Sequence, residues 1–307
     1  MKIGCMIDYM RLRYAFLGIA VAMLFFSSCV VEEPGDDPEK PDYSEYITDV
    51  FEYVYAPGQH AWKVKQEDGD KFKGEPNSDV LLGGFGGYII AGFNHDVENV
   101  EGEPDFEVFS SGVSPEPAVV YVMSDENGDG LPNDTWYELK GSEYGKPNEI
   151  RDYRLTYYKP KDTTSNILWK DNQGQSGELV SAYSSTNSST WWWSGLTGDS
   201  IVFKGTRLPD AYVNAGTQDS QNWIVPDTVF TWGYAENNKG SDYSKENRSN
   251  QFDISNAIDA QGVPVHLSRI RFIKVQTGVF QRAGWLNEVS SEVKGARDLH
   301  YCGACLD

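Results

Sequence analysis

The acidic stretch SDENGDGLPND, residues 124–134, holds the residues whose spacing best suits a defined chemistry. Oxygen-bearing side chains stand at alternate positions, at Asp125, Asn127 and Asp129, and Gly130 follows directly. An EF-hand loop begins in this way, because Ca²⁺ prefers hard oxygen ligands and the glycine permits a sharp turn. The pattern therefore predicts a calcium-binding loop.

The second half of this loop departs from the EF-hand pattern. The Leu131 carbonyl would be the backbone ligand, but Trp136 stands where an EF-hand has its bidentate glutamate. Asp134 or Glu138 would have to complete the coordination shell. The loop thus resembles the shorter calcium loops of dockerin and thrombospondin-type repeats. Since no flanking helices are expected, the ion would be structural and not a regulatory switch.

A hairpin loop without a metal is the alternative interpretation of the same stretch. It would join strands at residues 118–123 and 135–139, with the Asn-Gly and Asp-Gly pairs suited to a positive φ. A plain turn does not need acids at alternate positions, so the sequence favours calcium.

Aromatic residues offer a second kind of chemistry, which is stacking on a ligand. The polar run SSTNSST, residues 184–190, leads directly into Trp191, Trp192 and Trp193. In an extended chain, successive indoles point to opposite sides, so at least one would lie outside the core. We expect an exposed binding platform that a flat or apolar ligand face could cover. The residues that would complete it are Trp223, Trp232 and Tyr234. The alternative is that all of these side chains pack inside the protein.

Catalytic motifs are scarce. The four histidines, at positions 60, 95, 266 and 300, form no His-Glu-x-x-His motif, and the chain has no Gly-x-Ser-x-Gly elbow. A glycosidase-like pair could be drawn from the 46 acidic residues, but the sequence does not select one. The sequence therefore favours a protein that is not an enzyme, with no catalytic residue assigned.

The first residues predict a bacterial lipoprotein. Basic residues precede an apolar run at residues 14–26, and two serines lead to Cys29. Cleavage before Cys29 would remove residues 1–28 and place a lipid on this cysteine. The following residues, up to 42, are acidic and contain proline, which predicts a disordered tether. Acids directly after a lipidated cysteine also resemble the export signal of surface-exposed Bacteroidetes lipoproteins, which predicts a location on the outer membrane, at the cell surface.

Only two cysteines would remain once Cys5 has left and Cys29 carries lipid. Cys302 and Cys305 stand close to the end of the chain, and in an oxidising compartment they could form a local disulfide. A thioredoxin-like role would need a βαβ setting that the remaining chain cannot supply. With His300 they would make only an incomplete zinc site.

The net charge and the spacing of apolar runs define the class of protein. A formal charge of −20 repels phosphate backbones, so nucleic-acid binding is not expected. Short strand candidates, separated by polar turns, predict an all-β, jelly-roll-like β-sandwich with long loops. These candidates are residues 105–109, 118–123, 135–139, 151–158, 200–204, 228–234 and 266–276. We expect one such domain at residues 43–299, followed by a C-terminal tail at 300–307.

Several segments resemble a family of bacterial "cell surface proteins" known mainly from Bacteroidetes lipoproteins. They cover most of residues 79–299, and they are residues 86–96, 105–109, 116–122, 134–139, 252–259, 272–275 and 290–299. The resemblance implies a jelly-roll-like sandwich at the cell surface and supplies no active site.

The resemblance also implies a function in uptake. Surface lipoproteins of this group commonly capture ligands for TonB-dependent outer-membrane transporters, and similar proteins look like accessories of cobamide (vitamin B12) or glycan uptake systems. A non-catalytic ligand-binding protein is therefore our leading expectation, with a cobamide as the first ligand and a glycan as the alternative. A structural or adhesive surface protein and a glycoside hydrolase are the remaining alternatives.

Overall fold

The structure is a computed structural model of the 307-residue chain. It describes residues 42–112, 114–162, 165–180, 192, 195–217, 220–284 and 286–302. The chain divides into two units, Met1–Asp42 and Tyr43–Asp307, and all the elements named below belong to the second unit. No helix within the described ranges has the length and hydrophobicity needed to cross a membrane.

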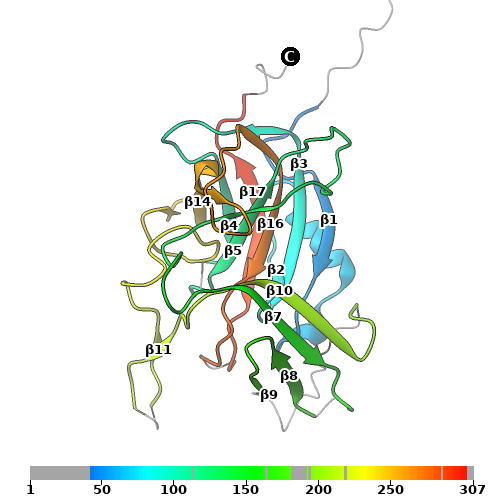
Figure 1. The fold of residues 1–307 in the computed structure, drawn as a ribbon, viewed down its shortest axis with the longest axis vertical. Helices are drawn as coiled ribbons and strands as arrows, with labels where there is room; N and C mark the ends of the chain where they lie inside the picture. Colours follow the sequence, from blue (N-terminus) through cyan, green and yellow to red (C-terminus); the bar gives the residue numbers. More distant parts are fainter. Residues whose placement is uncertain are drawn as a thin grey trace, which may run out of the picture. The chain divides into compact units, whose positions relative to one another are not determined.

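Two antiparallel sheets form the body of this unit (Figure 1). The six-stranded sheet has the order β1 (Asp49–Val54), β3 (Tyr88–Glu98), β16 (Arg269–Thr277), β5 (Ala118–Met123), β6 (Tyr137–Leu139) and β15 (Ala257–Ile258). The five-stranded sheet has the order β13 (Tyr243–Ser244), β14 (Ser249–Phe252), β4 (Phe106–Ser110), β17 (Ser291–Asp298) and β2 (Val80–Gly83).

The inner faces of both sheets share one hydrophobic core, which confirms the expected all-β sandwich. Ile89, Val120 and Val275 come from the six-stranded sheet, and Val108 and Val293 come from the five-stranded sheet. All five side chains are fully buried. β16 lies between β3 and β5, and its apolar residues Ile270, Phe272, Ile273 and Val275, which lie on both faces, predict such a central strand.

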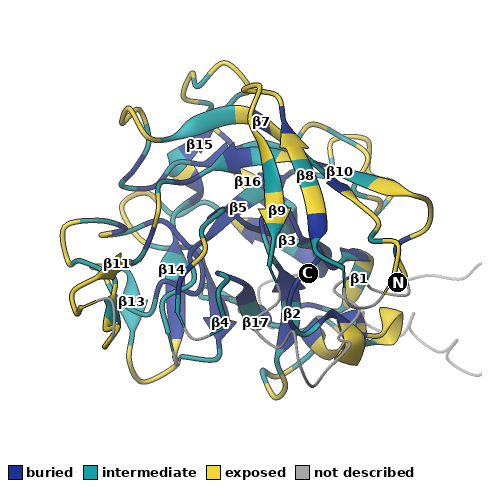
Figure 2. Ribbon diagram, turned by 90° about the horizontal axis from the view of Figure 1, so that it is seen from below, coloured by how far each residue is buried: buried dark blue, intermediate teal, exposed yellow. Residues whose placement is uncertain are grey.

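A separate four-stranded sheet contains both exposed and buried residues along its strands (Figure 2). Its order is β10 (Ser200–Arg207), β7 (Ile150–Tyr158), β8 (Ile167–Asp171) and β9 (Ser176–Leu179). The alternation of β7 buries Tyr153, Leu155 and Tyr157 on its inner side.

Short elements complete the described part of the chain. β11 (Val213–Asn214) and β12 (Trp223–Ile224) form a two-stranded sheet. The 3₁₀ helices are η1 (Ala61–Lys63), η2 (Gln66–Phe72) and η3 (Ile254–Asn256).

Most strands expected from the sequence are present. The prediction at 118–123 matches β5, and the predictions at 105–109, 135–139, 151–158, 200–204 and 266–276 overlap β4, β6, β7, β10 and β16.

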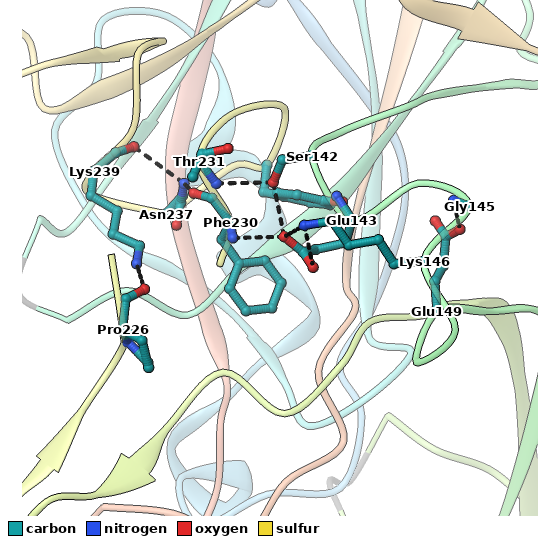
Figure 3. A network of polar contacts seen from close by, with 11 residues as sticks. Ser142, Glu143, Gly145, Lys146, Glu149, Pro226, Phe230, Thr231, Asn237 and Lys239 are labelled. Carbon is teal, nitrogen blue, oxygen red and sulfur yellow. Dashed lines mark hydrogen bonds and ion pairs between the residues drawn. The ribbon is translucent and has the colours of Figure 1, made fainter. Parts of the chain in front are cut away.

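The strand predicted at residues 228–234 is wrong, because side chains accept its backbone N–H groups in place of a neighbouring strand. The Phe230 amide donates to Glu143 and the Thr231 amide to the Ser142 hydroxyl, both at 2.9 Å. Phe230 also has a φ of +52°, in the left-handed region that a strand excludes. Figure 3 shows that the Ser142 hydroxyl, the Phe230 amide and the Lys146 ammonium group all contact the Glu143 carboxylate.

Candidate ligand-binding site

A cavity of about 680 Å³ opens beside the inner side of the four-stranded sheet. Its apolar wall is formed by Tyr157, Trp169 and Phe280, with Phe85 behind them. The Trp169 and Phe280 rings meet edge to face, with centroids 5.0 Å apart. The Tyr157 and Phe85 rings lie 6.4 Å and 6.3 Å from Phe280. Such edge-to-face contacts hold the rings of the wall in defined orientations.

Strand pairing explains why Trp169 faces this cavity. Trp169 on β8 lies directly opposite Tyr157 on β7, so both side chains share the inner side of the sheet. Its other neighbour is Gly177 on β9. A Cβ atom at Gly177 would lie only 2.9 Å from the indole, so the absence of a side chain leaves the space that the indole fills.

Arg207, the last residue of β10, brings a positive charge to the cavity. Its guanidinium carbon lies 5.3 Å from the centroid of the Tyr153 ring and 5.7 Å from that of Phe280. Among the described residues Arg207 has no ion-pair partner. An arginine stacked on aromatic rings keeps N–H donors for a planar acceptor.

Four acidic residues also line the cavity, Asp171, Glu178, Asp210 and Glu288, and two of them have defined hydrogen-bond partners. Asp171 is buried, and it accepts hydrogen bonds from the Tyr153 hydroxyl at 2.9 Å and from the backbone amides of Gln173 and Gln175 at 3.0 and 2.7 Å. Both carboxyl oxygens of Glu288 accept from the Gln59 amide, at 3.1 and 2.9 Å. Burial raises the pKa of Glu288 to about 8, so this carboxyl group is largely protonated at neutral pH.

The arrangement suits the binding of a ring-shaped molecule. An aromatic wall can cover the apolar face of a ring, while Arg207 and Glu288 can hydrogen-bond its polar edge. The volume of the cavity falls in the range typical of small-molecule sites, about 300–1,000 Å³. The chemistry available here is therefore recognition of a ligand with one apolar face and polar substituents.

Two residues of the predicted aromatic platform are buried in different clusters. Trp192 is only 7% exposed within the core that the sheets share, and its indole N–H donates to the Leu196 carbonyl at 3.3 Å. Tyr234 is 2% exposed in a second cluster, where it meets Phe230 edge to face at 5.4 Å. Neither side chain can stack on a ligand from these positions, which corrects their expected role.

The other platform residues are dispersed. Trp223 lies in β12, half-buried, with its N–H donating to Gln221 at 3.1 Å. Trp232 lines a separate cavity of about 310 Å³. Trp191 and Trp193 lie outside the described residues. The described members of the predicted platform thus do not assemble into one surface.

Trp169 and Phe280 are the aromatic residues that the sequence analysis missed. Trp169 stands in the short stretch ILWKD, which alternates like a strand, since Ile167 and Asp171 are buried and Leu168 is exposed. This alternation was the available signal for β8. Phe280 follows β16 in a connection without regular structure, so no local pattern marks it.

The predicted calcium loop is ordered by its own acidic side chains. The Asp125 oxygens accept from the backbone amides of Asp129 and Gly130, at 3.1 and 3.0 Å. Asn127 also accepts from the Asp129 amide at 2.9 Å, and Asp129 accepts from the Leu131 amide at 2.8 Å. Each Asp125 oxygen accepts one of these bonds, which leaves lone pairs for a cation.

Asp134 and Glu138 differ in their relation to this loop. Asp134 accepts from the Glu126 amide at 2.9 Å, so it belongs to the loop. Glu138 instead accepts from the Thr206 hydroxyl at 2.5 Å and lies 4.0 Å from Arg151, which corrects its expected place in the calcium shell. Within the described ranges, no three His, Cys, Asp or Glu side chains gather as metal ligands. Calcium binding, through Asp, Asn and carbonyl oxygens, stays a prediction.

The cysteine predictions fall partly outside the described chain. Cys302 takes part in a disulfide, whereas Cys305 and the predicted lipidation site Cys29 lie outside the described residues. The pairing of Cys302 with Cys305 therefore stays a prediction. Tyr301, just before, donates its hydroxyl to the Tyr43 carbonyl at 2.6 Å.

No protein-family model matches the chain, and no curated protein is similar enough to count as a relative.

Proposed function

We propose that this protein is a non-catalytic ligand-binding lipoprotein of the cell surface, and that it takes its ligand in the cavity beside Trp169. The observation that carries the proposal is the pairing of an aromatic wall, Trp169 and Phe280, with an arginine that has no ion-pair partner among the described residues. A surface that served only as a scaffold would not need a cavity of this composition.

The proposal that the protein serves in uptake is based on its sequence. The lipoprotein signal and the acidic segment after Cys29 support an anchor at the outer membrane with a tether between lipid and domain. The proposed partner is a TonB-dependent transporter, to which the protein would deliver its ligand.

A cobamide is the first ligand we propose. Its broad corrin face can lie against the Trp169–Phe280 wall, and its polar edge can meet Arg207. A glycan is the alternative within the same class, because the C–H face of a sugar also stacks on an indole. Because both ligands would stack on the same aromatic residues, only a binding measurement with each ligand can distinguish them.

A glycoside hydrolase is the second candidate, favoured by one observation. Glu288 and Asp171 line the same cavity, and burial raises the pKa of Glu288 to about 8, as a general acid requires. However, Asp171 already accepts three hydrogen bonds, which leaves it poorly placed as a nucleophile or base. The geometry therefore favours capture over hydrolysis.

Calorimetry on the purified full-length protein tests the proposal, with cyanocobalamin and soluble glycans titrated in separate runs. We expect one of them to bind, and we expect Trp169→Ala to weaken the affinity at least tenfold, because the stacking surface is lost. Trp62→Ala is the matched control, since Trp62 is 54% exposed and does not line the cavity.

The outcomes separate the candidates. Binding of cyanocobalamin supports a cobamide lipoprotein, and binding of an intact glycan supports polysaccharide uptake. Release of shorter sugars, abolished by Glu288→Gln, would establish the hydrolase instead. No binding and no hydrolysis would contradict the proposed function.

A further inference from the structure

A second cavity, of about 580 Å³, lies on the outer side of the six-stranded sheet. It is bounded by the sheet on one side and by residues of β7 and β10 on the other. The residues that define its chemistry are Tyr121, Trp136, Glu138, Arg151 and Lys274. None of them lines the cavity beside Trp169.

Strand register determines how this wall is built. Lys274 on β16 lies opposite Ile90 on β3 and opposite Tyr121 on β5. Tyr121 is in turn opposite Glu138 on β6. These residues form one row across the sheet, and alternation places the whole row on the same face. A lysine in the central strand is thereby directed out of the sandwich core and into the cavity.

Lys274 brings a positive charge close to two tyrosine rings, and Glu52 is an acidic residue that attracts it. Its ammonium nitrogen lies 4.4 Å from the Tyr88 ring centroid and 5.2 Å from that of Tyr121. Among the described residues it forms no ion pair. The nearby Glu52 accepts instead from the Tyr88 hydroxyl at 2.7 Å. Burial lowers the pKa of Lys274 to about 8, which reflects the cost of holding this charge away from water.

Arg151 provides a second cation with an incomplete set of partners. One terminal nitrogen donates to the Asp259 carbonyl at 2.9 Å and lies 4.0 Å from Glu138. Its Nε atom is buried and has no hydrogen-bond partner within the described part of the chain. Buried donors of this kind are rare in proteins, and an acceptor that the protein itself lacks is one physical explanation.

Glu138 does not supply the missing negative charge. Burial raises the pKa of Glu138, which weakens its ionised form, and its carboxyl group is engaged by Thr206. The cavity thus combines three cations, Arg151, Lys204 and Lys274, with Glu138, Asp152 and Asp259, inside a protein whose formal charge is −20. Asp152 pairs with Lys204 at 3.0 Å, and the Asp259 carboxylate accepts the Gln261 and Val263 amides, which leaves Lys274 and Arg151 to attract a further anion. An anion entering this cavity would meet attraction that solvent screens only weakly.

We propose that this cavity binds an anionic oxygen group, a carboxylate or a phosphate, between Lys274 and Arg151. The lysine supplies a point charge, and the arginine supplies directed N–H donors. Trp136, which lines the same cavity, can contact a ring that carries the anionic group. The site is independent of the ligand cavity beside Trp169.

Calorimetry on the purified full-length protein tests this site with two probes, inorganic phosphate and glucuronate, at constant ionic strength. We expect at least one probe to bind. Lys274→Met keeps most of the apolar stem but removes the charge, so the affinity should fall at least tenfold. Lys274→Arg should retain binding. Lys170→Met is the matched control, because Lys170 is exposed on β8 outside this cavity and should leave the affinity unchanged.

The two probes distinguish a phosphorylated ligand from an acidic sugar, and a second variant replaces Lys274→Met if that variant does not fold. Phosphate binding alone indicates a phosphorylated ligand, and glucuronate binding alone indicates an acidic sugar. If Lys274→Met fails to fold, Arg151→Gln carries the same expectation. The proposal is overturned if neither probe binds, or if Lys170→Met weakens binding as much as Lys274→Met, since that would indicate general surface attraction. Trp169→Ala should leave probe binding intact whether or not the proposed uptake function is correct.

Discussion

The carboxyl group of Glu288 shows how burial changes the chemistry of a single residue. It belongs to a set of glutamates whose pKa values burial raises, and the set consists of Glu116, Glu236, Glu288 and Glu292. Glu116 and Glu236 are distant in the sequence from Glu288 and Glu292, which share one segment. The pKa of each is raised further by another acid of the set or, for Glu292, by Asp79. A carboxyl group that stays protonated when folded binds more protons in the folded than in the unfolded chain.

This difference predicts how stability depends on pH. The pKa of Glu288 is about 4.5 in the unfolded chain and about 8 in the folded protein. The folded state therefore holds the extra proton between these values, so the free energy of unfolding should fall as pH rises from about 4.5 to about 8. The slope for one such group is at most about 1.4 kcal/mol per pH unit.

Glu288→Gln removes the titration of this residue while keeping a neutral side chain of the same shape. We expect its unfolding free energy, measured by denaturant titration at pH 5 to 8, to fall less steeply than that of the wild type. Glu67→Gln, at an exposed position in η2, should leave the slope unchanged. Equal slopes for Glu288→Gln and the wild type would refute the assignment.

Single residues also mark the limit of what the sequence could predict about the site. Trp191 to Trp193 form the most conspicuous aromatic run, yet Trp192 is buried in the sandwich core. The cavity instead uses Trp169 and Phe280, which are more than 100 residues apart in the sequence. Aromatic composition can predict that stacking surfaces exist, but which indole faces solvent depends on pairing between distant strands.

At the scale of elements, alternation predicted the longer strands well. β5, β7 and β16 each have a strong apolar pattern, and each was located close to its observed bounds. The segment at 228–234 has the same composition, but Glu143 and Ser142 accept its amides, and no local sequence signal reveals acceptors about 90 residues away. Short strands such as β11 to β13, with two residues each, have too few residues for a period to be recognised.

The loop at residues 124–134 carries the prediction that belongs to this scale. If Asp125, Asn127 and Asp129 bind Ca²⁺, EDTA should lower the melting temperature and added Ca²⁺ should restore it, because the ion binds only the folded loop. Calcium at about 100 times its dissociation constant contributes about 2.7 kcal/mol. For a domain of this size, the shift would be about 5–10 °C.

A variant pair separates metal binding from loop geometry. Asp125→Asn with Asp129→Asn should abolish the response to EDTA. Asp259→Asn is the matched control, because Asp259 also accepts two backbone amides in a turn, at 2.9 and 2.8 Å, and lies outside the acidic loop. A wild-type melting temperature that EDTA does not change would assign the stretch to a metal-free turn.

At the scale of the whole molecule, the sheet order is the part of the fold that no local pattern reveals. β16 pairs with β3 and β5, and β17 pairs with β4 and β2, so each sheet joins strands from both ends of the domain. Such pairings follow from burying two sheet faces against each other, and not from neighbouring residues. The fold class could be predicted because many short amphipathic strands have few other ways to bury their apolar faces.

The predicted lipid anchor gives the last prediction. A charge of −20 keeps the protein domain in water, so attachment to a membrane would depend on the acyl chains at Cys29. Each buried methylene contributes about 0.8 kcal/mol, and stable anchoring needs more than one chain. Cys29→Ser should therefore move the protein from the membrane pellet to the soluble or secreted fraction of a host that makes lipoproteins. Cys5→Ser is the matched control, because Cys5 lies within the predicted signal peptide and should leave the protein in the pellet. Retention of Cys29→Ser in the pellet, with its signal peptide removed, would mean that another part of the chain holds the protein at the membrane.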